Sequence, residues 1–255
     1  MDFSISIARM AERLSANLGV DPALLLPPPS PPPPLLPLAR YIDHTILRPE
    51  ATAGDVVRVC AEAREHGFRA VCVNPLWVRL AASELVGTET AVCSVCGFPL
   101  GANLTEVKLR EAELAMADGA TEIDVVIPIG PFRAGDYRGV LAELTALRRA
   151  TAGRVLKVIL ETGLLGMEEK IAGAILARYA GADYVKTSTG FSGRGATAED
   201  VALLRAAVGW TIGVKASGGI RDRAAAEAML AAGATRIGTS SGPAIVAPPG
   251  GDPAF

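Results

Sequence analysis

"GADYVKTSTG", residues 181–190, joins a glycine to a short β-branched run that ends in a lysine and small hydroxyl residues. Related stretches begin at Gly119 ("GATEIDVV") and Gly233 ("GATRIGTS"), and a less regular one begins at Gly67. Each glycine follows an Ala-rich stretch of helical character, where glycine is a common helix C-terminal residue. The chain therefore contains an internal repeat in which a helix ends at a glycine and a strand follows at once.

The repeat is part of a longer series that starts at residue 41. Short β-branched runs alternate with Ala/Glu/Arg-rich helical stretches, a pattern typical of βα units on a parallel sheet. Thr52 and Thr197 add weak capping boxes, each with an aspartate three positions later. The eight predicted strands begin at residues 41 (YID), 70 (AVCVN), 91 (AVCSVCG), 122 (EIDVVIP), 155 (VLKVILE), 183 (DYVKTS), 211 (TIGVKAS) and 235 (TRIGTS).

Eight βα units predict a closed TIM (β/α)8 barrel, an α/β fold in which alternate strands contribute side chains to one interior layer. By this count the repeat predicts one shared layer, in which an acid faces a base and a glycine leaves room. Its members are Cys72, Asp124, Lys186 and Gly238. The alternative, an open doubly wound sheet, requires a Gly-rich fingerprint after the first strand. Residues 41–52 ("YIDHTILRPEAT") contain none, which favours the barrel.

Residues 1–40 differ from the rest of the chain. A short amphipathic segment at roughly 5–18 precedes "LLLPPPSPPPPLLPLAR" (24–40), and nine of the 18 prolines lie before residue 40. Such a run favours extended polyproline II. We expect a Pro-rich N-terminal extension, semi-rigid or disordered, with a docking peptide or an oligomer contact as the alternative. The predicted organisation is thus an extension at 1–40 and a barrel domain at 41–255.

The composition excludes several classes of function. A net charge of -2 and an aromatic content of 5% argue against a nucleic-acid partner, and no apolar run is long enough to span a membrane. The N-terminus lacks the pattern of a secretory signal, so we expect a cytoplasmic protein acting on a small molecule, either as a homodimer or as a higher homo-oligomer.

The cysteines are expected to be reduced, structural thiols. "CSVC" (93–96) has the spacing of a redox or zinc half-site, but positions three apart in a strand point to opposite faces. With only two histidines in the chain, a His-rich metal site is not expected, and we predict no metal and no cofactor. The four cysteines are Cys60, Cys72, Cys93 and Cys96, and the histidines are His44 and His66.

Three of the five lysines occupy strand-like runs, although lysine is seldom buried. Strand periodicity places Lys157, Lys186 and Lys215 on the inward face, opposite apolar positions such as Val158, Val185 and Val214. Their charges then need partners inside the barrel. One hypothesis is a structural ion-pair cluster with Asp43, Asp124 and Glu161. The other is catalysis, because barrel enzymes hold their active sites at the carboxyl ends of the strands.

The loops after the last two strands favour catalysis on a phosphorylated compound. "KASGGIRD" (215–222) offers Gly218 and Gly219 ahead of a helix that should start near Asp222, and "IGTSSG" (237–242) offers Ser240 and Ser241. In this fold these two loops are the usual phosphate site, and backbone N–H groups next to glycines suit an anion. "TSTG" (187–190) adds further donors.

A lysine in such a site has an evident use. An ordinary ammonium, with a pKa of about 10.4, is not a nucleophile at neutral pH. Burial and a nearby cation lower a lysine's pKa towards about 7 to 8, which frees the amine to form a Schiff base with a carbonyl. Lys186 beside Lys215 fits this arrangement, with Asp124 moving protons through water. The residues thus predict a Schiff-base lyase for a small phosphorylated carbonyl compound.

Five stretches together carry a family resemblance from about residue 41 to about 245: "YIDHTIL", "EIDVVIPIG", "LKVILETG", "YVKTSTGF" and "GVKASGGIR". They resemble deoxyribose-phosphate aldolase, a family of class I aldolases with a TIM-barrel fold. The resemblance implies reversible cleavage of 2-deoxyribose 5-phosphate to acetaldehyde and glyceraldehyde 3-phosphate, a step of deoxyribonucleotide catabolism.

The resemblance also assigns roles to individual residues. It implies that Lys186 forms the Schiff base, that Lys215 helps it to lose its proton, and that Asp124 relays protons. Asp43 and Lys157 match polar positions that hold this network. The implied phosphate contacts are Gly190, Gly218, Gly219, Ser240 and Ser241.

Two positions depart from the family pattern. Phe191 stands where some members have a lysine, which removes one charge from the phosphate site, and the chain ends in Phe255 where some members end in tyrosine. Three alternatives stay open: a transaldolase or longer-chain ketose aldolase, a barrel that binds a sugar phosphate without turnover, and a metal-dependent aldolase.

Overall fold

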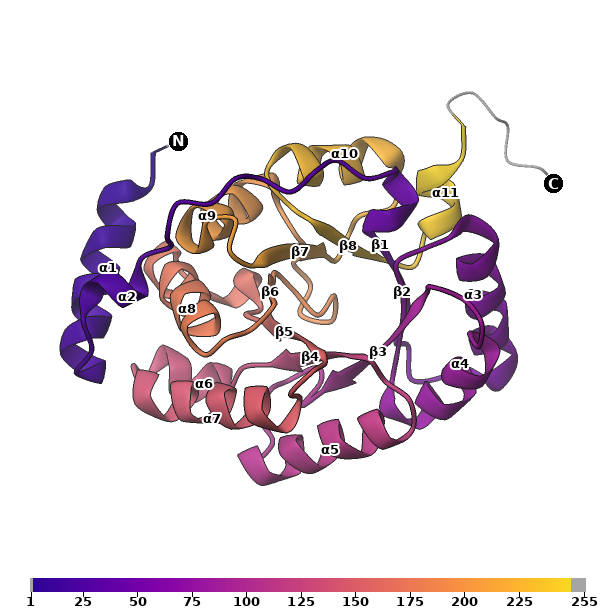
Figure 1. The fold of residues 1–255 in the computed structure, drawn as a ribbon, viewed down its shortest axis with the longest axis horizontal. Coiled ribbons are helices and arrows are strands. Elements are labelled where there is room, and N and C mark those ends of the chain that lie inside the picture. The colour runs from indigo at the N-terminus through magenta and orange to yellow at the C-terminus, as the bar shows by residue number, and fades with distance from the viewer. Residues whose placement is uncertain (1, 249–255) are drawn as a thin grey trace.

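A computed structural model describes residues 2–248, and these form a closed barrel of eight parallel strands in the order β1 to β8 (Figure 1). Every strand pairs with the next one along the chain, and β8 closes the barrel on β1. The predicted TIM barrel is therefore confirmed, and each predicted run overlaps one strand, although the first run covers only the start of β1. The strands are β1 Ile42–Ile46, β2 Ala70–Val73, β3 Ala91–Cys96, β4 Glu122–Val126, β5 Val155–Ile159, β6 Tyr184–Lys186, β7 Gly213–Ser217 and β8 Arg236–Thr239.

The helices surround the barrel, and several begin at side-chain caps visible in the sequence. Thr52 forms a full capping box with Asp55, whereas Thr197 accepts only the backbone N–H of Asp200. The helices are α1 Ser4–Leu18, α2 Pro22–Leu25, α3 Ala53–His66, α4 Val78–Glu84, α5 Thr105–Ala117, α6 Ile129–Arg133, α7 Tyr137–Ala150, α8 Met167–Tyr179, α9 Ala198–Val208, α10 Arg223–Ala231 and α11 Gly242–Val246, with 3-10 turns η1 Leu38–Tyr41, η2 Pro75–Trp77 and η3 Thr162–Leu164. No helix in this part of the chain is long and apolar enough to cross a bilayer.

The two faces of the strands differ in chemistry. Outward positions such as Val158, Val185 and Val214 are fully buried against the helices, as the strand periodicity predicted. Inside the barrel, an apolar cluster that includes Cys72, Cys93 and Val95 occupies the β2–β3 side. The remaining inward positions include seven buried charged residues, Asp43, Glu122, Asp124, Lys157, Lys186, Lys215 and Arg236. Charges buried to this extent need partners inside the barrel.

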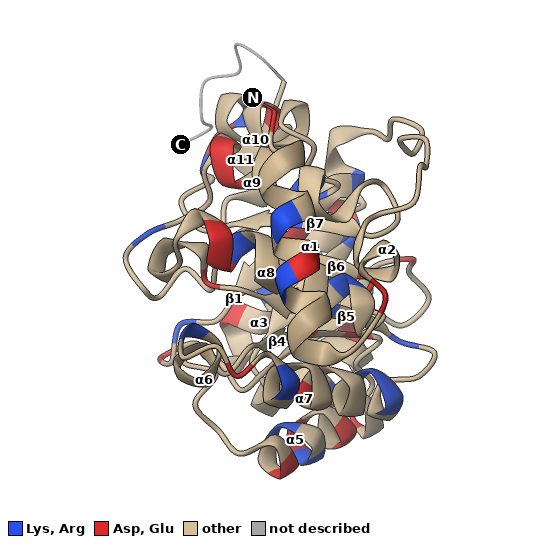
Figure 2. Ribbon diagram, turned by 90° about the vertical axis from the view of Figure 1, so that its left-hand side faces the viewer, with Lys and Arg blue, Asp and Glu red and all other residues tan. Residues whose placement is uncertain are grey.

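The amphipathic part of the N-terminal segment is packed on the barrel, whereas the Pro-rich run at 27–37 has no helix or strand and is mostly exposed. α1 packs beside α8, and its apolar face, including Met10 and Leu14, joins the same core as the strands. In Figure 2, α1 lies in front of α8, and basic and acidic residues are interspersed over this side of the molecule. The Pro-rich run then passes next to Gly209, where an added Cβ would lie 2.8 Å from Pro27. The amphipathic pattern of α1 therefore reflects the burial of its apolar face beside α8.

Candidate active site

A pocket of about 390 Å³ opens at the carboxyl end of the barrel. It is lined by the ends of β1, β6, β7 and β8 and the loops that follow them, together with Arg58 and Val59 of α3. Lys186 is the one lysine among its lining residues. The apolar part of the lining comprises Ile46, Leu47, Val59, Phe191 and Ile220.

Lys186 ends β6 and is nearly buried, with 3% of its side chain exposed. Its Nζ donates a hydrogen bond to Asp124 Oδ2 at 2.8 Å. Lys215, on the neighbouring strand, donates to the same oxygen at 2.8 Å. Two ammonium groups therefore share one carboxylate oxygen, and this places the predicted pair of lysines next to each other.

Lys215 and Lys157 each bridge two or more carboxylates. Lys215 also donates to Asp43 Oδ2 at 2.5 Å. Lys157 Nζ lies 2.7 Å from Asp124 Oδ1 and 2.6 Å from Glu122 Oε2. The structure thus brings together the five residues predicted as catalytic or supporting.

Burial and ion pairing act in opposite directions on the pKa values of this cluster. Burial alone would raise the pKa of the Asp124 carboxyl, but the ammonium groups of Lys157, Lys186 and Lys215 hold it well below its usual range. Burial would also raise the pKa of Asp43, but neighbouring cations lower it, and Arg236 contributes most to the lowering. Burial would lower the pKa of Lys215, but Asp124 and Asp43 raise it above its usual value. The pKa of Lys157 is raised for the same reason.

The cluster contains one more cation than carboxylates. Its three carboxylates are Asp43, Glu122 and Asp124, and its four cations are Lys157, Lys186, Lys215 and Arg236. Three of the cations each contact at least two carboxylates, whereas Lys186 contacts only Asp124. Lys186 therefore has fewer carboxylate partners than any other cation of the cluster.

Two members of the cluster were missed by sequence reasoning. Arg236 donates to Asp43 Oδ1 at 2.7 Å and contacts Glu122 at 3.3 Å. Glu122 stands two positions before Asp124 in the same strand, so strand periodicity places it on the same face but identifies no partner for it. An arginine at the first position of β8 could have been noticed, because a buried guanidinium also needs partners.

Glu161 lies apart from the cluster, contrary to the structural ion-pair hypothesis. It follows β5, is 1% exposed, and accepts hydrogen bonds from the backbone N–H and the hydroxyl of Thr189. Its φ of 59° is the one positive value of a non-glycine residue in 2–248. Glu161 therefore anchors the loop that follows Lys186.

Most of the predicted phosphate contacts line the pocket. Gly190, Gly218, Gly219 and Ser240 belong to its lining. Gly218 and Gly219 have φ values of +91° and +79°, which only glycine adopts readily. No backbone hydrogen bond in the turns and loops of 2–248 uses the N–H of Gly190, Gly218 or Gly219, so these groups remain open to an anion.

Ser241 has a different place. It is not among the lining residues, and its N–H donates to Thr239 Oγ1 at the start of α11. The lining instead includes Arg48, Arg58 and Arg221, none of which the sequence reading singled out. Arg48 and Arg58 pair with carboxylates, whereas Arg221 has no ion pair to another residue of 2–248.

Phe191 is 51% exposed at the pocket, and its ring packs edge-on against Phe98 with centroids 5.3 Å apart. The lysine that some family members have here is thus replaced by an aromatic contact between two loops. Phe255, the other departure from the family pattern, lies outside the described residues.

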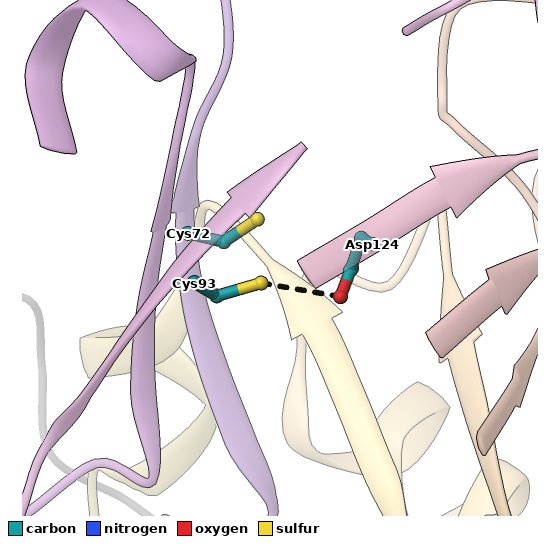
Figure 3. Close-up of side chains that lie close together, drawn as sticks. All are labelled: Cys72, Cys93 and Asp124. Atoms are coloured by element: carbon teal, nitrogen blue, oxygen red, sulfur yellow. Dashed lines mark hydrogen bonds between the residues drawn. The ribbon is translucent and has the colours of Figure 1, made fainter. Parts of the chain in front are cut away.

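The cysteines behave as the strand geometry predicted, with one addition. Cys93 points into the barrel and bonds Asp124 at 3.1 Å, while Cys96 contacts Lys108 outside it. All four thiols are free and buried. Cys72 on the adjacent strand joins Cys93 and Asp124 within 4.8 Å, a grouping with metal-ligand spacing (Figure 3). Because Asp124 already pairs with three lysines, a divalent cation there would be strongly repelled.

Comparison with known proteins agrees with this geometry. The family described as "DeoC/LacD family aldolase" matches residues 38–247. A deoxyribose-phosphate aldolase of Brevibacillus brevis is 54% identical over 207 residues, which are 81% of this chain and 94% of that protein.

Two solved structures are similar over a larger share of the chain. A putative deoxyribose-phosphate aldolase from Coccidioides immitis has a TM-score of 0.83 at 40% identity, covering 94% of this chain and 96% of that one. A tetrameric deoxyribose phosphate aldolase from Aeropyrum pernix has a TM-score of 0.77 at 34% identity, covering 95% and 96%. The resemblance noted in the sequence is thereby confirmed, and the chain belongs to the DeoC/LacD family of aldolases, which are lyases.

Proposed function

We propose that the protein is a class I aldolase that reversibly cleaves 2-deoxy-D-ribose 5-phosphate to acetaldehyde and D-glyceraldehyde 3-phosphate through a Schiff base on Lys186. The observation that carries this proposal is the position of Lys186. It is the cluster cation with a single carboxylate partner, and it is the lysine that lines the pocket. A lysine in this position can meet the carbonyl of a substrate in the pocket.

The first half of the reaction forms the imine. The neutral amine of Lys186 attacks the C1 aldehyde of the open-chain sugar phosphate and gives a neutral carbinolamine. A proton delivered to the carbinolamine hydroxyl lets it leave as water and yields a protonated imine. In the cleavage step, a base removes the proton of the C3 hydroxyl, the C2–C3 bond breaks, and its electron pair forms an enamine on C1–C2. Glyceraldehyde 3-phosphate leaves, C2 takes up a proton, and hydrolysis releases acetaldehyde and the free lysine.

Asp124 is suited to relay these protons because its basicity changes with the charge of Lys186. While Lys186 is an ammonium, three cations hold the pKa of Asp124 down. Once Lys186 is neutral, one of the three is lost and the carboxylate becomes a better base. Lys215 keeps its two carboxylate partners throughout and repels a proton from Lys186.

The phosphate is proposed to bind between Gly190, Gly218, Gly219 and Ser240. Open N–H groups on these glycines and the start of α10, capped by Asp222, favour an anion at this end of the barrel. Ser241 is retained as a proposed contact, one that would require its N–H to exchange Thr239 for the ligand. Arg221 lines the same pocket and offers a positive charge where Phe191 offers none.

We further propose that residues 41–255 carry this activity, and that the protein works in the cytoplasm as a homo-oligomer. Its four free thiols suit a reducing compartment. Exposed apolar side chains on and before α5, including Leu104, Val107 and Leu114, are candidates for a subunit contact. Light scattering during gel filtration will give the oligomeric state.

Reductive trapping tests the proposed chemistry. We expect borohydride and acetaldehyde to leave an ethyl adduct on Lys186, identified by peptide mass mapping, and excess 2-deoxyribose 5-phosphate to suppress it. An adduct on Lys215 would reverse the two lysines. A folded protein that binds the sugar phosphate without any lysine adduct would be a non-catalytic barrel. A preference for a ketose donor over acetaldehyde would indicate a transaldolase or ketose aldolase instead.

A further inference from the structure

Arg236 and Glu122 form a second charged level inside the barrel, beneath the reacting groups. Arg236 is 2% exposed and Glu122 is also 2% exposed, and neither lines the substrate pocket. Both residues stand at the first position of their strands, β8 and β4, whereas Lys186 ends β6. They therefore do not touch a substrate that occupies the pocket.

This lower level is connected to the upper one through two residues. Arg236 Nη1 lies 2.7 Å from Asp43 Oδ1, and Asp43 Oδ2 accepts a hydrogen bond from Lys215. Glu122 Oε2 lies 2.6 Å from Lys157 Nζ, and Lys157 bonds Asp124. Arg236 and Glu122 also contact each other, which closes the ring of alternating charges.

The ring is enclosed by further groups that can carry charge or hydrogen bonds. Tyr184 of β6 lies beside Arg236, with its hydroxyl 3.4 Å from Nη2. On the upper level, Cys72 of β2 and Cys93 of β3 lie beside Asp124. The groups that face Lys186 or Arg236 from the surrounding strands are therefore Asp43, Cys72, Cys93, Glu122, Asp124, Lys157, Tyr184 and Lys215.

We propose that Arg236 and Glu122 are positioning residues that set, with opposite sign, the pH range in which Lys186 is deprotonated and able to form an imine. The role assigned to Lys186 rests on the proposed function. With all groups charged, the ring is neutral, and the ring together with Lys186 carries one excess positive charge. Removal of Arg236 leaves three cations for three carboxylates, so Lys186 is needed as a partner and keeps its proton. Removal of the Glu122 charge leaves two excess cations, so Lys186 loses its proton more readily.

Coulomb's law gives the size of the effect. At a separation of roughly 10 Å and an effective dielectric constant of about 20, one unit charge shifts a titration by about one pH unit. We therefore expect Arg236→Met to raise the pH of half-maximal activity by about one unit and Glu122→Gln to lower it by about one unit. The double variant R236M/E122Q restores a single excess cation and is expected to return close to the wild-type pH profile.

The test measures how fast Lys186 captures acetaldehyde covalently in the presence of cyanoborohydride. The rate of each variant is measured between pH 5 and pH 10 and divided by the wild-type rate at the same pH. Arg236→Lys, which keeps the charge, is expected to rescue the profile of Arg236→Met. Glu143→Gln is the matched control, because it removes a buried carboxylate that pairs with Lys108 outside the ring, and its profile should coincide with wild type.

The outcomes are distinct. Opposite shifts of the two single variants, cancelled in the double variant, would support the inference. Lower rates with unmoved profiles would show that the two residues only hold the fold, and shifts in the same direction would also overturn the proposal. If Arg236→Met does not fold, the proposal is still tested by Glu122→Gln, whose profile must shift to lower pH, and by the double variant, whose profile must return towards wild type. The capture assay uses acetaldehyde as its only carbonyl compound, so its result does not depend on which sugar phosphate is the substrate. The identity of the substrate is tested separately, by measuring cleavage of 2-deoxyribose 5-phosphate.

Discussion

Lys186 and Lys215 donate hydrogen bonds to one and the same oxygen, Asp124 Oδ2, each at 2.8 Å. Two ammonium groups at a single acceptor repel each other, and only Lys215 has a second carboxylate, Asp43, to hold its charge. This asymmetry separates the two lysines chemically although they are neighbours on paired strands. It supports the proposed roles of Lys186 as the nucleophile and of Lys215 as a cation beside it.

Lys215→Met should therefore move the pH profile of cleavage upwards. Without the neighbouring cation, Lys186 keeps its proton to higher pH, and at a separation of about 5 Å we expect a shift of about two pH units. Lys215→Arg is the control, since it retains the charge and should leave the profile in place even if the rate falls. A Met variant with the wild-type profile would contradict the tuning role.

Lys186→Arg should abolish turnover while the fold survives. A guanidinium preserves the charge next to Asp124 but cannot form an imine, so kcat should fall by at least about a thousandfold. Lys170→Arg, at a lysine of α8 that pairs with Asp200 away from the pocket, should retain full activity. Circular dichroism will show whether both variants are folded, and substantial activity in the Lys186 variant would place the nucleophile elsewhere.

Phe191→Lys should improve the use of phosphorylated substrate. The side chain is half exposed at the pocket, so a new ammonium there is screened by water and contributes about 0.2–1 kcal/mol, which is a decrease in KM of up to about fivefold. The gain should disappear in high salt. Phe191→Met serves as the control for loss of the contact with Phe98, and an equal KM in the two variants would rule out a charge effect.

Gly101→Ala should destabilise the fold much more than Gly87→Ala. Both glycines have left-handed φ, +68° and +78°, so both variants should lose about 1–2 kcal/mol from backbone strain. A Cβ on Gly101 would also lie 1.9 Å from the Ile127 carbonyl oxygen, whereas one on Gly87 meets nothing within 4 Å. Urea unfolding should show an additional loss of about 1–3 kcal/mol for Gly101→Ala. Equal losses would mean that the loop shifts without cost.

Acid should destabilise the barrel through its buried carboxylates. The pKa values of Asp43 and Asp124 are lowered in the folded state, so their contribution is fully present above the unfolded pKa of about 3.9 and is lost as pH falls below it. The free energy of unfolding should drop steeply below about pH 4. In Asp43→Asn the slope should decrease by up to about 1.4 kcal/mol per pH unit. An unchanged slope would indicate that surface carboxylates dominate acid unfolding.

The fold could be predicted almost completely from the chain. The helix-ending glycines, the eight β-branched runs and the threonine caps are local signals, and each one recurs in the structure near its predicted position. The exception is the N-terminal segment. α1 was recognised as amphipathic, but the partner of its apolar face, α8, follows about 150 residues later, and such a contact leaves no local trace.

The strand residues of the site could be predicted better than its loop residues and its ion pairs. Strand periodicity alone places Lys157, Lys186, Lys215 and Asp124 on the inward face, because successive side chains alternate between faces. It also places Arg236 on that face, but it could not say that Arg236 would contact Asp43, that Ser241 would turn away from the pocket, or that Glu161 would hold the loop after Lys186. Those outcomes depend on register between strands and on loop geometry.

The sequence by itself determined the barrel and the inward direction of its charged residues, because both follow from short-range periodicity and turn chemistry. Only the tertiary structure decided which lysine has one carboxylate partner and which has two. That difference arises from distances across the closed barrel between residues far apart in the chain, and the electrostatic energies that separate Lys186 from Lys215 depend on those distances.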